Sequence, residues 1–247
     1  MAIVFKALEK SSALMILFAG LLLCGSSFAG GKAEKTQGGI ILVLKGSHYE
    51  MGFQHGSLLA KEVKENIKAY LYDFAFDAAK HKREELRKIY ETQEPFIPAY
   101  IKEEMKGLAE GSGASLEDVQ LVHILPTIYH CSGAAVFGKA VKDKKLYHFR
   151  SLDYAINIGK EKKVQENAAV IVYQPDDGIA HAVVGWAGVL GAVSGMNAEG
   201  ISIGEMGSSS KEDGFNGEPM WFVVRDALKN SRTLDDALNI MKKAKWD

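Results

Sequence analysis

The chain has 247 residues, 47% of them hydrophobic, with 30 lysines and arginines against 31 aspartates and glutamates. The formal net charge of -1 gives no electrostatic basis for binding nucleic acid, so we expect no nucleic-acid partner. Beyond the N-terminal region, the sequence has no apolar segment of the ~20 residues that a membrane-spanning helix needs. We therefore expect no stable membrane insertion.

The N-terminus has the pattern of an export signal. The apolar run from Ala13 to Cys24 is too short to span a bilayer, and the small residues of Ser27-Phe28-Ala29 suit a signal peptidase. We predict a signal peptide over residues 1–29 and a periplasmic or extracellular protein. A lipoprotein would instead be acylated on Cys24, but Leu23 is too large for that pattern.

From Ser57 to about Gln120 the pattern is helical. Gly111-Ser112-Gly113 interrupts it, and Ser115 with Asp118 is typical of a capped helix start. Apolar residues recur at three- and four-residue steps and make one helix face: Leu58, Leu59, Val63, Ile67, Tyr70, Leu71 and Phe74. These aromatic and aliphatic residues are best explained as core packing between helices.

After residue 130 the apolar period shortens towards two, which is typical of strands. Two helices follow, one from Met220 to Leu228 and one that Thr233 and Asp236 cap, expected to run to Asp247. The expected strands are residues 134–137, 146–152, 168–173, 180–186, 189–196 and 201–206. The order of helices, consecutive antiparallel strands and helices predicts an α+β fold. Because no closing strand follows, we expect the chain to be a fragment of a longer protein.

One cysteine, Cys131, remains after the predicted signal peptide. An unpaired thiol is unusual in an exported protein, because oxidising compartments favour an even cysteine count. Such a thiol is buried and inert, paired with another chain, or kept for its reactivity. The residues around it favour reactivity.

The motif His130-Cys131-Ser132-Gly133, followed by Arg150-Ser151-Leu152-Asp153, resembles the start of an N-terminal-nucleophile (Ntn) hydrolase. It is most similar to the penicillin acyltransferase family of acyltransferases and amidases, with bile-salt and penicillin V amidases as more distant relatives. Two further blocks support the resemblance, residues 46–56 and 195–200. It implies an αββα sandwich, with a mainly helical pro-segment over residues 30–130 and an incomplete catalytic domain over residues 131–247.

The resemblance also implies a mechanism. The precursor would cut itself between His130 and Cys131, and the freed α-amine would act as general base for the thiol of the same residue. An α-amine has a reference pKa of about 7.7–8, so a useful fraction is unprotonated near neutrality. The implied substrate is a small amide or thioester, attacked through an acyl-cysteine intermediate, with no cofactor. The pro-segment and the catalytic chain are expected to stay associated after cleavage.

By the family pattern, Arg150 would favour the thiolate and contact the substrate, while Asp153 would hold the α-amine. Residues three apart in a regular strand point to opposite faces, so we expect a bend or strand end to bring both side chains towards Cys131. The alternative is a structural Arg–Asp pair at the end of a strand.

The oxyanion hole departs from the family pattern. Amide-cleaving relatives have an asparagine after the hairpin, where this sequence reads Gly204-Glu205-Met206-Gly207. Backbone amides of this segment would have to substitute, or Glu205 has a different role. Asn197 lies in the turn and is expected there for its tolerance of left-handed geometry. His148 would share a strand face with Arg150 and either line the pocket or pack in the core.

Three alternatives stay open at this point. His123, His130 and His148 with Cys131 would form a metal site, but their spacing matches no dense zinc pattern, and we expect no metal. A papain-like Cys–His pair lacks its usual flanking signature. A non-catalytic exported module for a small ligand, with Cys131 buried and inert, is the main competing function.

Overall fold

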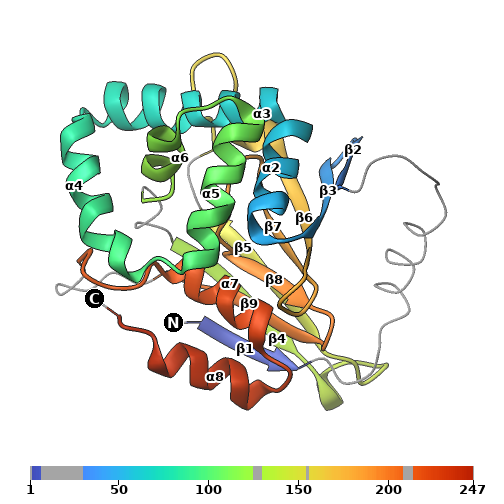
Figure 1. Ribbon diagram of the computed structural model, residues 1–247. Helices are drawn as coiled ribbons and strands as arrows, with labels where there is room; N and C mark the ends of the chain where they lie inside the picture. The colour runs from blue at the N-terminus through green and yellow to red at the C-terminus, as the bar shows by residue number, and fades with distance from the viewer. Residues whose placement is uncertain (1, 7–29, 125–129, 154–155, 208–213, 247) are drawn as a thin grey trace.

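The computed structural model describes residues 2–6, 30–124, 130–153, 156–207 and 214–246 (Figure 1). Residues 7–29 of the predicted signal peptide lie outside the described residues. Its first residues, Ala2–Lys6, form strand β1, which pairs antiparallel with the last strand of the main sheet.

The main sheet has seven strands in the order β1-β9-β8-β7-β6-β3-β2. Four consecutive strands form an antiparallel meander, as the sequence predicted: β6 (Ala168–Pro175), β7 (His181–Trp186), β8 (Ser194–Asn197) and β9 (Ile201–Glu205). The predicted strand over residues 189–196 is too long, because its first part is a buried loop rather than a strand. The order of these strands is as predicted, and one of them is shorter than predicted.

Two strands from the first half of the chain join the same sheet. They are β2 (Lys32–Thr36) and β3 (Gly39–Gly46), and the sequence analysis predicted neither. Strand β3 lies parallel to β6, with Ile40 opposite Ala169 and Gly46 opposite Pro175. The residues on either side of position 130 thus share one sheet.

Most of the remaining first half is helical, as predicted. It comprises α2 (His48–Leu58), α3 (Ala60–Ile67), the π-helix η1 (Lys68–Ala78), α4 (Arg83–Gln93), the 3-10 turn η2 (Glu94–Phe96), α5 (Ala99–Ser112) and α6 (Leu116–Val122). None of the helices in the described part of the chain combines the length and apolarity of a bilayer-spanning segment.

Four glycines let helices α2 and α5 approach backbone to backbone. A Cβ atom on Gly52 would lie 2.2 Å from a main-chain oxygen of α5, and one on Gly56 would lie 2.5 Å from another. The converse holds on α5, where a Cβ on Gly107 or Gly111 would lie 2.1 or 2.3 Å from a main-chain oxygen of α2. Gly52 and Gly56 of the 46–56 block are therefore required for packing.

Side-chain caps fix where several helices begin. Ser47 and Glu50 form a capping box at the start of α2, and Ser115 accepts a hydrogen bond from the backbone N–H of Asp118 at α6. After helix α7 (Met220–Asn230), Thr233 caps α8 (Leu234–Lys243) as predicted. Helix α8 ends at Lys243, before the predicted end at Asp247.

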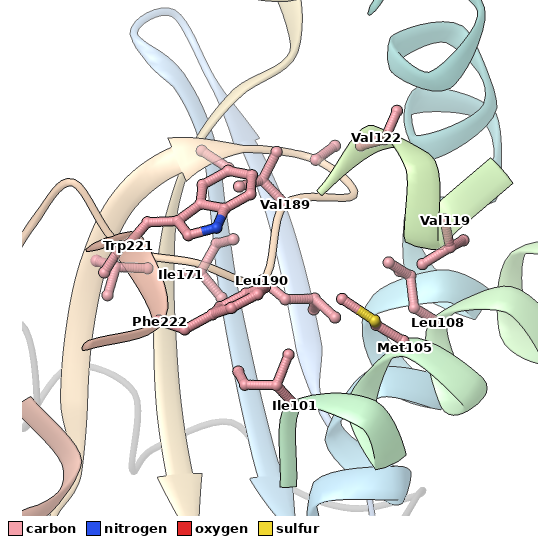
Figure 2. Close-up of a cluster of buried hydrophobic side chains, with 14 of the residues drawn as sticks. Ile101, Met105, Leu108, Val119, Val122, Ile171, Val189, Leu190, Trp221 and Phe222 are labelled. Carbon is pink, nitrogen blue, oxygen red and sulfur yellow. The ribbon is translucent and has the colours of Figure 1, made fainter. Parts of the chain in front are cut away.

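One hydrophobic core joins both halves of the chain (Figure 2). Side chains from α5 and α6 meet β6, the buried loop and the start of α7: Ile101, Met105, Leu108, Val119, Val122, Ile171, Val189, Leu190, Trp221 and Phe222. The helical region before residue 130 therefore packs directly on the strands and helix that follow it.

Strands β4 (His130–Val136) and β5 (Tyr147–Asp153) form a separate antiparallel hairpin. The two faces of β9 show where it packs: Ile201 and Ile203 belong to the helical core, whereas Ser202 and Gly204 meet β5. In the described residues the layers are helices, the main sheet and the hairpin. The architecture is α+β, as the sequence predicted.

Candidate active site

Cys131 is the second residue of β4 and lies on the face of the hairpin that turns towards β9. The register pairs it with Leu152, and it pairs the next residue on the same face, Gly133, with Arg150. Its side chain is half-buried and carries a free thiol. It is therefore neither paired nor fully enclosed among the described residues.

Arg150 reaches from β5 to the thiol. Its Nη2 atom lies 2.6 Å from Cys131 Sγ, and its Nε atom donates to the main-chain oxygen of Glu205 at 3.0 Å. A guanidinium cannot be deprotonated in a protein, so this contact places a permanent positive charge beside the sulfur. The predicted meeting of Arg150 with Cys131 is present in the structure.

Glu205 completes this contact. Its Oε2 atom lies 3.1 Å from Arg150 Nη2 and 4.0 Å from Cys131 Sγ. The side chains of Arg150 and Glu205 are only 6% and 7% exposed. Burial raises the pKa of Glu205, and the charge of Arg150 opposes that rise. The guanidinium is thus shared between a thiol and a carboxyl group.

Asp153 lies on the opposite face of the hairpin. We expected a bend or a strand end to bring Asp153 towards Cys131; β5 stays regular, so the bend is absent, and Asp153 is the last residue of the strand. The Asp153 carboxylate instead accepts hydrogen bonds from the hydroxyls of Ser132, at 2.6 Å, and Ser151, at 3.0 Å. Neither serine was predicted as a site residue, because serine is common in strands and turns.

His130 pairs with Asp153 in the register of the hairpin. The predicted cleavage bond between His130 and Cys131 therefore lies at the start of β4, next to residues 125–129, which are outside the described residues. The bond is within a strand whose partner carries both Arg150 and Asp153.

His148 lies on the same face as Arg150, as their spacing predicted. Its Nδ1 atom is 2.6 Å from Ser202 Oγ, and burial lowers its pKa. Gly204 makes this contact possible, because a Cβ there would lie 3.0 Å from His148 Nε2 and 3.3 Å from Arg150 Cβ. His148 thus packs where the hairpin meets β9.

Asn197 has a structural position at the end of β8. Its amide donates to the main-chain oxygens of Leu228 and Ser231 and accepts from the N–H groups of Glu199 and Ile201. The expected left-handed conformation at Asn197 is wrong, since Gly200 takes it with φ of 81°.

In the segment around Glu205, one backbone N–H group is not available to bind an oxyanion. The backbone N–H of Glu205 donates to the main-chain oxygen of Val193 at 2.8 Å, so it cannot bind an oxyanion in this arrangement. His123, which belonged to the metal alternative, is buried, with its ring nitrogens on the Val119 oxygen and the Leu190 N–H. Within the described ranges, no group of three or more His, Cys, Asp and Glu is arranged to hold a metal ion.

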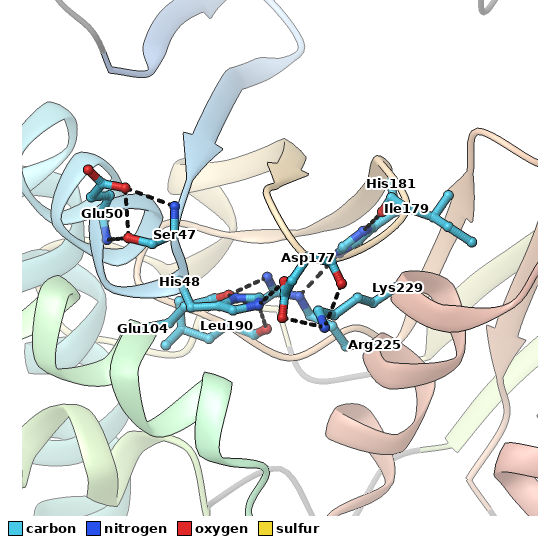
Figure 3. A network of polar contacts seen from close by, with 10 residues as sticks. All are labelled: Ser47, His48, Glu50, Glu104, Asp177, Ile179, His181, Leu190, Arg225 and Lys229. Atoms are coloured by element: carbon cyan, nitrogen blue, oxygen red, sulfur yellow. Dashed lines mark hydrogen bonds and ion pairs between the residues drawn. The ribbon is translucent and has the colours of Figure 1, made fainter.

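A second polar cluster lies away from the thiol, between the helices of the first half and α7 (Figure 3). The ring nitrogens of His48 contact Glu104 at 2.7 Å and Asp177 at 2.9 Å. Lys229 reaches Asp177 Oδ2 at 3.2 Å, and Arg225 binds Glu104 through both of its terminal nitrogens. This cluster links elements on both sides of position 130.

Comparisons with known proteins agree with the resemblance. The family model described as acyl-coenzyme A:6-aminopenicillanic acid acyl-transferase matches residues 148–245. This segment contains Arg150, Asp153 and Glu205 but begins after Cys131. The predicted resemblance to this family is confirmed over this segment.

Three relatives extend the similarity over most of the chain. Protein dcd1B of Dictyostelium discoideum is 29% identical over 245 residues, covering 87% of this chain and 48% of that protein. Protein dcd1A of the same organism is 26% identical, with coverages of 81% and 52%. An uncharacterized protein of Archaeoglobus fulgidus is 27% identical, with coverages of 86% and 40%. The chain spans about half the length of the curated relatives it matches.

Proposed function

We propose that this protein is an exported, self-processing cysteine hydrolase or acyltransferase that acts on a small amide or thioester. The observation that carries the proposal is the 2.6 Å contact between Arg150 Nη2 and Cys131 Sγ. The family match over residues 148–245 supports the reaction class. The alternative of an inert, buried cysteine has less support, because Cys131 is half-buried and lies against a guanidinium.

In the proposed reaction, Cys131 Sγ attacks the carbonyl carbon of the acyl group. A sulfur–carbon bond forms, the C–N bond of an amide or the C–S bond of a thioester breaks, and the leaving group takes a proton. Water or an amine then cleaves the acyl-cysteine and restores the thiol. Arg150 stabilises the thiolate, and the α-amine of Cys131 moves the proton.

Self-processing would use the same thiol. Cys131 Sγ attacks the carbonyl carbon of His130, the peptide bond breaks, and the nitrogen of Cys131 takes a proton to become the α-amine. Water then hydrolyses the thioester and leaves His130 with a carboxylate. This sequence of steps needs no cofactor.

The proposed fold is the αββα sandwich, completed by a helical layer on the outer face of the β4–β5 hairpin. Large apolar side chains lie on that face, with Val136 46%, Tyr147 53% and Phe149 60% exposed. A two-stranded sheet with an uncovered apolar face is marginal in water. The matched relatives are about twice as long as this chain, which supports further residues as the source of that layer.

We also propose that residues 1–29 are removed on export and that residues 30–130 stay bound after cleavage. Strand β3 lies inside the main sheet next to β6, and α5 and α6 share the core with α7. Separating the two pieces would break the sheet and expose that core.

Intact-mass spectrometry of the purified full-length gene product tests the proposal. We expect two fragments that meet at His130 and Cys131, and one uncut chain for Cys131→Ala. Cys24→Ala serves as the matched cysteine control and should process like the wild type. A wild-type chain that stays uncut after prolonged incubation would overturn self-processing and favour the binding module.

A further inference from the structure

We propose that Ser132 and Ser151 are positioning residues that hold the Asp153 carboxylate against the backbone of Cys131, where the α-amine forms. The proposal rests on the proposed self-processing function and goes beyond it by assigning the two serine hydroxyls. It also assigns the thiol and the α-amine of Cys131 to partners on opposite faces of the hairpin.

The register of the hairpin places the carboxylate. Asp153 is opposite His130, yet its Oδ2 atom lies 2.6 Å from the hydroxyl of Ser132, two residues further along β4. Residues 130 and 132 share a strand face and flank Cys131. The carboxylate therefore reaches from the position opposite His130 to that of Ser132, on the face away from the thiol.

The second oxygen is held as well. Ser151, which is opposite Ser132 in the register, donates its hydroxyl to Asp153 Oδ1 at 3.0 Å. An ionised carboxylate only accepts hydrogen bonds, so both hydroxyls must act as donors here. A carboxylate without such donors would sample several rotamers. Two donors on two oxygens restrict it to one orientation.

This arrangement gives the two reacting groups of Cys131 different partners. The thiol faces Arg150 and Glu205 between the hairpin and β9. The nitrogen of the same residue lies in the hairpin backbone, between residues 130 and 132, whose face carries the Asp153 carboxylate. After cleavage the new α-ammonium carries a positive charge, and a fixed carboxylate would attract it and keep it in place for proton transfer to and from Sγ.

The test compares Ser132→Ala, Ser132→Thr and Ser151→Ala in the full-length protein. Ser57→Ala is the control, since Ser57 is an exposed serine on α2 whose hydroxyl donates to main-chain oxygens of its own helix. Two quantities are measured: the rate of self-cleavage by intact mass, and the pH profile of alkylation of processed Cys131 by iodoacetamide. Peptide mass mapping assigns the alkylated cysteine.

We expect Ser132→Ala to slow self-cleavage about tenfold and Ser151→Ala to slow it less, because a misplaced catalytic group loses rate steeply. A nearby carboxylate favours the ammonium form, so releasing the Asp153 carboxylate from its fixed position should move the amine inflection of the alkylation profile to lower pH. Ser132→Thr retains the hydroxyl and should restore both the rate and the profile. Ser57→Ala should match the wild type.

The inference is overturned if the wild type cleaves and Ser132→Ala keeps its rate and alkylation profile. It is also overturned if Ser132→Thr behaves like Ser132→Ala, since the hydroxyl would then not be the cause. A wild type that never cleaves would overturn the proposed function itself and this assignment with it. The two failures are therefore distinguishable by the wild-type mass alone.

Discussion

Glu104 and Arg225 form a bidentate ion pair in the interior, between α5 and α7. Arg225 Nη1 lies 2.7 Å from Glu104 Oε2, Nη2 lies 2.8 Å from Oε1, and both side chains are 0% exposed. The guanidinium also lies over the ring of Tyr173 at 3.5 Å. Since α5 precedes the predicted cleavage bond and α7 follows it, this pair connects the two proposed pieces.

Removing the charge of one partner of this ion pair should lower the free energy of unfolding. Glu104→Gln leaves the fully buried Arg225 without a counter-charge, and such losses typically cost about 3–5 kcal/mol of unfolding free energy. Urea denaturation followed by circular dichroism measures the change. The control is Glu103→Gln, whose side chain pairs with Lys106 at the surface and should matter by less than about 1 kcal/mol. A loss below about 1 kcal/mol for Glu104→Gln would contradict the assigned role of the pair.

Local patterns predicted most of the fold, and tertiary pairing explains what they missed. The apolar run of residues 189–193 has the composition of a strand, yet histidines satisfy part of the backbone of this loop. Gly188 N donates to His55 Nε2 and Leu190 N donates to His123 Nε2. Periodicity cannot distinguish amides bound by side chains from amides bound by a neighbouring strand. For the same reason, the pairing of β3 with the distant strand β6 is not readable from either segment alone.

The candidate site was predictable in part. The motif placed Arg150 beside Cys131, and the two-residue period of strands already put Asp153 on the other face. Of the two expected features, a bend or a strand end, the bend is absent because β5 keeps its regular pairing through Asp153, which is the last residue of the strand. Ser132 and Ser151 give no distinctive signal in one sequence, and only the register of the hairpin shows that their hydroxyls meet Asp153.

Stability should fall as the pH falls below 6.5. Burial lowers the pKa of His55 to about 3, of His123 to about 4 and of His181 to about 3, whereas an unfolded histidine titrates near 6.5. Between pH 6.5 and about 4 the unfolded chain therefore binds more protons, and each histidine contributes a loss of roughly 1.4 kcal/mol per pH unit.

Urea denaturation at pH 7 and pH 5 measures this loss. The side chain of Gln in His123→Gln cannot be protonated and retains an acceptor for the N–H of Leu190. The pH dependence of the stability of this variant should therefore be smaller, by the contribution of one proton. Burial raises the pKa of Glu205 and of Asp226, and these groups act in the opposite direction at lower pH. Equal stability of the wild type at both pH values would contradict the burial of neutral histidines.

The negative charge of Glu205 should lower the reactivity of the Cys131 thiol. Its carboxyl group lies 4.0 Å from Cys131 Sγ and competes for the guanidinium of Arg150. Glu205→Gln removes a negative charge beside the thiolate, so iodoacetamide should alkylate Cys131 faster at neutral pH, by about threefold to tenfold. Arg150→Ala removes the positive charge and should slow the same reaction about tenfold. Changes of the same sign in both variants would refute this electrostatic account.

The close contact of α2 with α5 should tolerate no side chain at its glycines. Gly107→Ala would place a Cβ 2.1 Å from the main-chain oxygen of Tyr49, so the two helices would have to separate and lose packing along their length. We expect a loss of about 2–4 kcal/mol of unfolding free energy in urea denaturation. Gly185→Ala, in β7, is the matched control because its Cβ would meet nothing within 4 Å. A strand interior favours alanine over glycine, so this control should be neutral or slightly stabilising. Similar losses for both variants would contradict the conclusion that the contact between the two helices requires glycine at position 107.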